Sequence, residues 1–112
     1  MSRNVLYVGE KLTTGQSLIN GNYRLTLLGD GNLALYDLEK LIWETGTNGV
    51  ASDNYLVLQN DGNLVIYTSD SKSVVWSSKT SGKGSGNYVL VLQDDRNLVI
   101  YTDPIWATHT NK

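Results

Sequence analysis

Residues 55–67 read YLVLQNDGNLVIY, and this stretch decides the fold. Two runs rich in β-branched and aromatic residues, Tyr55 to Gln59 and Asn63 to Thr68, flank the turn-forming Asn60-Asp61-Gly62. A turn of this kind between two strand-like runs is a strong β-hairpin signal. Ser73 to Ser78 follows as a third strand. The sequence therefore predicts strand, tight turn, strand, short loop and strand.

The same unit occurs three times along the chain. Aligning on the turn gives Asp30-Gly31-Asn32, Asp61-Gly62-Asn63 and Asp95-Arg96-Asn97. Each copy has a Tyr four residues after the Asn and then reaches a Trp preceded by an aliphatic residue, at positions 43, 76 and 106. Such repetition indicates a repeat architecture. We expect residues 1–112 to form one domain with three internal repeats, at about 20–45, 52–78 and 86–108.

The composition agrees with a single all-β domain. A chain of 112 residues with 40% hydrophobic residues is large enough to bury a core without metal or disulfide support. Residues that favour strands outweigh helix formers in almost every window, which excludes an all-helical bundle. With Val5 to Val8 and a short piece around Leu18, about a dozen short strands are predicted, as in sandwiches, barrels and prisms.

Charge and hydropathy exclude several classes of partner. The net charge is -2 and the nine basic residues are thinly spread, so we expect no nucleic-acid partner. No apolar run approaches the roughly 18 residues of a membrane span, and the start lacks the apolar core of a signal peptide. We expect a soluble chain without direct membrane insertion, cytoplasmic or secreted without a leader. The absence of Cys excludes disulfides and thiolate chemistry.

Alternation with a period of two assigns the two faces of the central hairpin. Leu64 and Ile66 point to one side, where Leu56, Leu58 and Trp76 should join them in the core. We expect all three Trp residues to be central core residues, one per repeat.

The opposite face carries the candidate chemistry. It presents an amide, a carboxylate, a second amide and a phenol around one apolar residue: Gln59, Asp61, Asn63, Val65 and Tyr67. The third repeat has the same set at the same spacing: Gln93, Asp95, Asn97, Val99 and Tyr101. A β-turn needs Asp, Asn and Gly, but not the flanking Gln and Tyr. Donors and acceptors around a small apolar patch match the hydroxyls and C–H groups of a monosaccharide.

This pattern, Q-x-D-x-N-x-V-x-Y, resembles the mannose-binding signature of the bulb-type lectins of monocot plants. The resemblance covers nearly the whole chain, including Leu6-Tyr7-Val8-Gly9-Glu10 and Ile105-Trp106-Ala107-Thr108. It implies a type II β-prism of three four-stranded antiparallel sheets with pseudo-threefold symmetry. It also implies multivalent, calcium-independent binding of α-D-mannose and high-mannose glycans, in defence or agglutination. In the family, Asp and Asn bind the axial 2-hydroxyl, Gln the 3-hydroxyl and Tyr the 4-hydroxyl, while Val contacts the ring carbons.

The first repeat departs from the signature. Leu28 stands at the Gln position and Ala34 at the Val position, which leaves a degenerate site of Asp30, Asn32 and Tyr36. We expect this site to be weak or silent. The resemblance further implies a homodimer that exchanges C-terminal strands, for which residues 105–110 are the candidate. The two positions of the disulfide found in plant members are here Gly31 and Asn54.

Other functions fit less well. A calcium loop that starts at Asp61 would have Val65 at its fifth position, where an oxygen ligand is required. The Asp residues recur once per repeat at equivalent places, which favours binding over catalysis by paired carboxylates. His109 is expected to be a solvated tail residue, so we predict no enzyme, no cofactor and no metal. A β-trefoil lectin and a prism-fold interaction module with vestigial sugar sites remain as alternatives.

Overall fold

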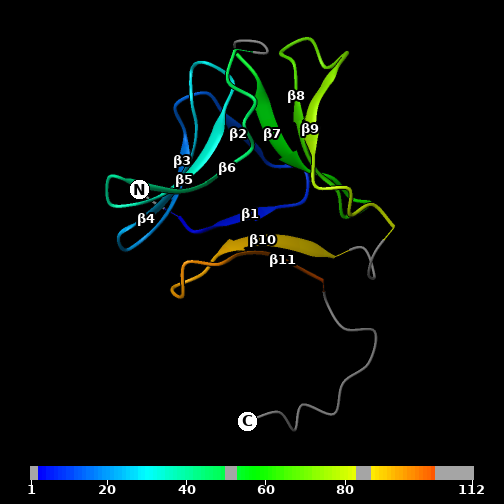
Figure 1. Ribbon diagram of the computed structural model, residues 1–112. Coiled ribbons are helices and arrows are strands. Elements are labelled where there is room, and N and C mark those ends of the chain that lie inside the picture. The colour runs from blue at the N-terminus through cyan, green and yellow to red at the C-terminus, as the bar shows by residue number, and fades with distance from the viewer. Residues whose placement is uncertain (1–2, 50–52, 83–86, 103–112) are drawn as a thin grey trace, which may run out of the picture.

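The computed structural model describes residues 3–49, 53–82 and 87–102, which form eleven short strands and no helix. They pair into three antiparallel sheets, with strand orders β1-β10-β11, β2-β7-β8-β9 and β3-β4-β5-β6, arranged like the faces of a prism (Figure 1). The strands are β1 (Val5–Tyr7), β2 (Lys11–Thr13), β3 (Ser17–Asn20), β4 (Tyr23–Leu27), β5 (Leu33–Asp37), β6 (Lys40–Glu44), β7 (Tyr55–Leu58), β8 (Leu64–Tyr67), β9 (Val74–Ser77), β10 (Tyr88–Leu92) and β11 (Leu98–Thr102). Within the described ranges, nothing has the length and apolar character of a membrane-crossing helix.

The predicted all-β fold with three antiparallel sheets is confirmed. Two sheets have the expected four strands, and the third has three within the described residues. The segment predicted as a further strand, residues 105–110, lies outside the described residues.

The core consists mainly of leucines that alternate along the strands. Leu56, Leu58 and Ile66 are fully buried and Leu64 is nearly so, as the alternation predicts. The pattern repeats in β10, where buried and half-buried residues alternate from Tyr88 to Leu92. Because side chains on a strand point to opposite faces in turn, each sheet turns one face toward the core and the other outward. The candidate binding residues lie on the outward faces.

The first two strands join distant parts of the chain. β1 pairs with β10 through Leu6 and Leu90, whereas β2 pairs with β7 through Leu12 and Leu56. The link between them is fixed where the Gly9 N–H donates to the Leu58 carbonyl at 2.9 Å. The N-terminal segment thus ties the sheet of the third repeat to the sheet of the second.

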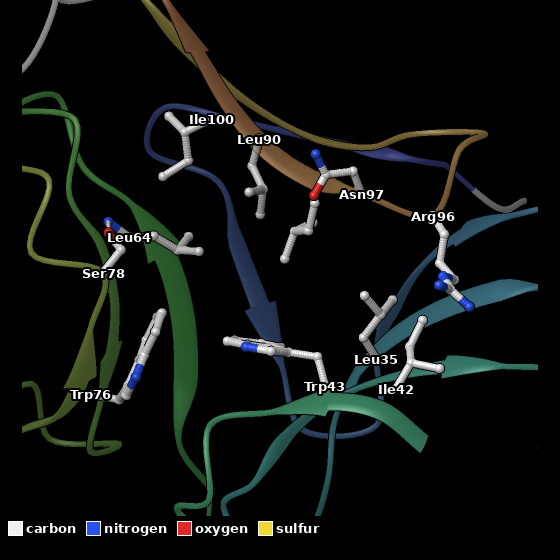
Figure 2. A pocket seen from close by; sticks show the side chains of 11 residues that line it. Leu35, Ile42, Trp43, Leu64, Trp76, Ser78, Leu90, Arg96, Asn97 and Ile100 are labelled. Atoms are coloured by element: carbon white, nitrogen blue, oxygen red, sulfur yellow. Dashed lines mark hydrogen bonds between the residues drawn. The ribbon is translucent and has the colours of Figure 1, made fainter. Parts of the chain in front are cut away.

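The prediction that every Trp is a central core residue is wrong for Trp43. Its side chain is 39% exposed, whereas Trp76 is half-buried and packs against the core. The two rings meet edge to face with their centroids 6.0 Å apart. Both lie on outer strands, β6 and β9, and border a cavity of about 390 Å³ that is also lined by Leu64, Leu90 and Ile100 (Figure 2). Among the described residues, the two rings therefore contribute to the wall of a cavity and are not enclosed at the centre of the core. Trp106 lies outside the described residues.

The turn of the central hairpin requires glycine for two reasons. Gly62 has a φ of +87°, a conformation that side chains other than glycine's rarely adopt. In addition, a Cβ at this position would lie 2.7 Å from two ring carbons of Tyr88, which is 7% exposed. The turn of one sheet thus packs directly onto the sheet of the next repeat.

We expect Gly62→Ala to destabilise the fold more than Gly15→Ala does. Gly15 has nearly the same φ, +86°, but a Cβ there would meet nothing within 4 Å. Gly15→Ala should cost about 1–2 kcal/mol for the left-handed backbone. The clash with Tyr88 should add about 1–3 kcal/mol in Gly62→Ala. Urea unfolding of both variants measures the difference, and equal losses would mean that the Tyr88 contact is unimportant.

Candidate functional site

The turn between β7 and β8 is held by its own backbone and by one carboxylate. The Gly62 N–H donates to the Gln59 carbonyl at 3.0 Å, and the Gln59 N–H donates to the Asn63 carbonyl at 2.9 Å. The Asp61 Oδ1 accepts the Asn63 N–H at 2.9 Å. Such a bond from an Asp to the backbone two residues on is a common way to fix a turn. The second carboxylate oxygen has no hydrogen-bond partner among the described residues.

The side chain of Asn63 is oriented by the segment that follows β9. Its Oδ1 accepts hydrogen bonds from the Ser78 hydroxyl at 3.1 Å and from the Thr80 N–H at 3.2 Å. The Thr80 hydroxyl in turn donates to the Gly62 carbonyl at 2.7 Å. Because the amide oxygen is engaged, the amide NH₂ is left as the donor on the solvent side. Asp61 and Asn63 thus offer an acceptor and a donor next to each other.

Gln59 and Tyr67 lie together on the same outer face. The Gln59 amide NH₂ donates to the Tyr67 hydroxyl across the hairpin. The Tyr67 ring also packs against Tyr55, at 5.7 Å between centroids, and Tyr55 is held by Ser71 at 2.6 Å and by Lys11 above its ring. These contacts fix the phenol in place. Beside them, a shallow cavity of about 400 Å³ is lined by residues that include Val57, Gln59 and Asp61.

Val65 is more deeply buried than its expected role, apolar contact with the sugar ring, requires. It is 2% exposed, so it forms the floor beneath the polar side chains and offers almost no surface. The corresponding Val99 is half-buried.

The β10–β11 hairpin repeats this arrangement. The Gln93 N–H donates to the Asn97 carbonyl at 2.9 Å, and the Asp95 Oδ1 accepts the Asn97 N–H at 3.0 Å. The Gln93 amide NH₂ donates to the Tyr101 hydroxyl. Arg96 occupies the glycine position with a φ of +79°, an unusual conformation for a side chain of this size. The third repeat therefore has the same polar set as the second.

The two hairpins differ in how far they are covered. β8 lies between β7 and β9, whereas β11 is an edge strand within the described part of its sheet. Accordingly, Asn97 is exposed where Asn63 is half-buried, and Tyr101 is 46% exposed. Hydroxyl partners equivalent to Ser78 and Thr80 would come from positions 108 and 110, which lie outside the described residues.

The first repeat keeps the turn but not the open site. The Asp30 Oδ1 accepts the Asn32 N–H at 3.0 Å, as in the other repeats. Leu28 cannot form the bond that Gln makes to Tyr, and Arg24 instead lies over the Tyr36 ring at 4.7 Å. Ala34 is fully buried and Asn32 is 6% exposed. The Asp-x-Asn pair therefore has a structural role here whether or not a ligand binds.

The signature residues do not include the segments after β6 and β9, which orient Asn32 and Asn63. Their signal is present in the sequence as a Trp followed two and four residues later by hydroxyl residues: Thr45 and Thr47, Ser78 and Thr80, Thr108 and Thr110. The first two pairs contact the Asn of their repeat. The described ranges contain no group of three or more His, Cys, Asp or Glu residues that could hold a metal.

Comparison with known proteins identifies the family. The chain is 39% identical to a mannose-specific lectin of Aloe arborescens over 97% of this chain and 99% of that protein. It is 47% identical to a mannose-specific lectin of Galanthus nivalis, over 60% of this chain and 43% of that protein. The chain thus spans less than half the length of this second relative. No protein-family model matches.

Solved structures agree with these relatives. The snowdrop (Galanthus nivalis) mannose-specific agglutinin complexed with methyl-α-D-mannoside superposes with a TM-score of 0.86 at 46% identity, covering 97% of this chain and 98% of that one. The Polygonatum cyrtonema lectin complexed with monomannoside gives 0.84 at 46% identity, covering 96% and 97%. The fold and the two matched hairpins define a β-prism lectin. The chain belongs to the family of bulb-type mannose-specific lectins of monocots. Lectins bind carbohydrate and are not enzymes, so the prediction of no catalytic activity is confirmed.

Proposed function

We propose that the protein binds α-D-mannose and high-mannose glycans at two sites, Gln59 to Tyr67 and Gln93 to Tyr101. The observation that carries this proposal is that both hairpins hold the same polar side chains with the same hydrogen bonds. The names of the relatives and the mannosides in two of the related structures support it. In this proposal residues 1–112 are one lectin domain, and each of its three repeats supplies one hairpin.

The chemistry of the site fits a ring of vicinal hydroxyls. A hydroxyl that meets the free oxygen of Asp61 and the NH₂ of Asn63 can donate to one and accept from the other. The ionised carboxylate makes the stronger of these bonds. Gln59 and Tyr67 already lie within hydrogen-bonding distance of each other, as do the oxygens of two neighbouring hydroxyls on a sugar. By the resemblance, the first pair meets the 2-hydroxyl and the second pair the 3- and 4-hydroxyls.

We also propose that the protein is a dimer that exchanges C-terminal strands. In the described residues, β11 has an unpaired edge, and the neighbouring cavity is lined by apolar residues that include Trp43, Trp76 and Leu98. The segment after Asp103 carries Ile105, Trp106 and the two hydroxyl residues that Asn97 needs by analogy with Asn63. In this proposal, the segment pairs with the edge of β11, and its apolar side chains fill the cavity. The alternative is that each chain fills its own cavity, and related Gastrodia elata lectins are described as monomeric.

The affinity of the protein for cells would depend on valency. A shallow site of few side chains should bind one monosaccharide with a dissociation constant on the order of 1 mM. Two sites per chain and four per dimer could raise the avidity for branched glycans by roughly 10²–10⁴ where the spacing permits simultaneous binding. Recognition or agglutination of mannose-bearing cells or viruses is the role proposed on this basis.

Binding should be selective for mannose and independent of calcium. The polar groups of the site meet particular hydroxyls directly, so an epimer leaves some of them unpaired. We expect retention on mannose-agarose to be unchanged after exhaustive EDTA and to be reversed by mannose but not by galactose. Loss of retention in EDTA would contradict a metal-free site, and equal elution by galactose would contradict the selectivity. Lack of any retention would favour an interaction module with vestigial sites.

Replacing the turn Asp by Asn should remove sites one at a time. Asp61→Asn and Asp95→Asn keep an oxygen that can accept the backbone N–H of the turn, but they replace the outward acceptor with a donor. Each should lower the number of methyl α-mannoside molecules bound in calorimetric titration from two to one. Asp30→Asn is the matched control and should leave the number at two, because Leu28 and Ala34 already spoil that site.

The same variants test valency. Asp61→Asn should weaken binding of a branched mannan far more than it weakens binding of the monosaccharide to the site that remains. Equal losses would mean that avidity does not contribute. If Asp30→Asn removes as much binding as the other two substitutions, the assignment of the sites is wrong.

Truncation after Asp103 should lower both the stability and the molecular mass in solution. It removes the segment proposed to pair with β11 and to fill the cavity beside the Trp43 and Trp76 rings. Light scattering coupled to size-exclusion chromatography measures the mass, and urea unfolding measures the stability. A monomeric mass of the full chain at high concentration would rule out strand exchange.

A further inference from the structure

The strand that pairs with the second strand of the hairpin differs between the first and second repeats at the position after its Trp. In the first repeat, this position is Glu44 in β6. The strand pairing sets Glu44 opposite Ala34 in β5–β6, and it sets Ser77 opposite Val65 in β8–β9. The two positions are therefore equivalent, one residue after the Trp of each repeat. In the third repeat the same spacing from Trp106 gives Ala107. Only the first repeat has a charged residue here.

The Glu44 carboxylate engages the Asn that would face a ligand. The Asn32 Oδ1 accepts hydrogen bonds from the Gly46 N–H at 3.0 Å, the Thr47 N–H at 3.2 Å and the Thr45 hydroxyl at 3.2 Å. These donors turn the amide NH₂ away from them, and it donates to the Glu44 Oε1 at 2.8 Å.

Among the described residues, the corresponding NH₂ of Asn63 has no such partner. The difference is also visible in accessibility, since Asn32 is 6% exposed whereas Asn63 is half-buried and Asn97 is exposed. The exposed Glu44 side chain therefore engages the amide NH₂ of Asn32, the donor that Asn63 leaves open among the described residues.

We propose that Glu44 closes the first site and is a specificity-determining residue of this lectin, an inference that rests on the proposed mannose sites. Its carboxylate takes the amide hydrogen that a sugar hydroxyl would need as its donor. A hydrogen bond to an ionised group is stronger than one to a hydroxyl, so a sugar cannot displace Glu44 without loss. This obstacle is separate from the missing Gln and Val. Restoring Leu28→Gln and Ala34→Val therefore leaves the site closed.

The bond also explains why the first hairpin keeps its Asp-x-Asn turn without binding sugar. With Glu44 in place, the Asn32 side chain hydrogen-bonds with four residues of one continuous segment, 44–47. It joins the hairpin turn to the end of β6. A binding residue has thus become a cross-strand clamp, and the turn is retained for stability.

The test isolates the first site in an Asp61→Asn/Asp95→Asn background, in which the other two sites are removed. The first variant adds Leu28→Gln/Ala34→Val to this background. The second adds the same pair together with Glu44→Ser, because Ser is the residue at the equivalent position 77. The third adds Leu28→Gln/Glu44→Ser. The third variant avoids enlarging Ala34, which is fully buried. Binding of methyl α-mannoside is measured by calorimetry, and thermal unfolding establishes that each variant folds.

We expect the two variants with Glu44→Ser to bind one sugar. Their affinity should exceed that of the variant retaining Glu44 by about tenfold or more, in line with the strength of a hydrogen bond to a charged group. Comparable binding by Leu28→Gln/Ala34→Val would overturn the proposal, as would the absence of binding in both Glu44→Ser variants. The unmodified protein separates the failure of the proposed function from the failure of the proposal on Glu44. If it binds no mannose, the proposed function is wrong. If it binds two mannose molecules and the Glu44→Ser variants bind none at the first site, only the role of Glu44 is wrong.

Discussion

In the first two repeats, the hydrogen bonds to the Asn side chain at the end of the hairpin turn connect the fold of this protein to its surface chemistry. In the second repeat, the Asn63 amide oxygen is held by Ser78 and Thr80. This side chain thereby ties the turn to the segment that follows β9, and the engagement of its oxygen leaves its NH₂ as the group that faces solvent. The Asp two residues earlier is used in the same way, with one oxygen for the turn and one to spare. The same two residues thus hold the turn and form the proposed site, but with different atoms. One Asp61 oxygen and the Asn63 amide oxygen hold the turn, and the other Asp61 oxygen and the Asn63 NH₂ are left for a ligand.

This division explains how one site can decay while the fold persists. The inner face of each hairpin consists mainly of leucine, and the first repeat keeps it intact with Leu25, Leu33 and Leu35. Its turn still has the Asp30 bond to the backbone of Asn32. The departures from the signature, Leu28 and Ala34, lie on the other face of the hairpin, as does the neighbouring Glu44, and they leave the leucine face unchanged. Burial of the inner face supplies most of the stability of such a sheet, so changes on the other face are tolerated.

Much of this organisation follows from local sequence patterns. The hairpins, their turns and the buried side chains of the second repeat were predictable because turn chemistry and period-two alternation act over a few residues. The pairing of β1 with β10 and of β2 with β7 was not, because contacts between distant segments leave no local pattern. The exposure of Trp43 was missed because its ring meets a cavity at the junction of three sheets. The bond between Asn32 and Glu44 joins two residues whose relation depends on the register of β5 and β6.

The prism also decides how the proposed sites are presented. The β7–β8 and β10–β11 hairpins belong to different sheets that share one core, so their outer faces point in different directions (Figure 1). Two sites that diverge in this way cannot both contact one sugar residue. They can hold separate branches of a glycan or separate particles. With weak individual sites, useful affinity then arises only where mannose is presented densely or on branched chains. In the proposed scheme, closure of the first site by Glu44 would remove one of the three directions of binding while keeping the hairpin that the core requires.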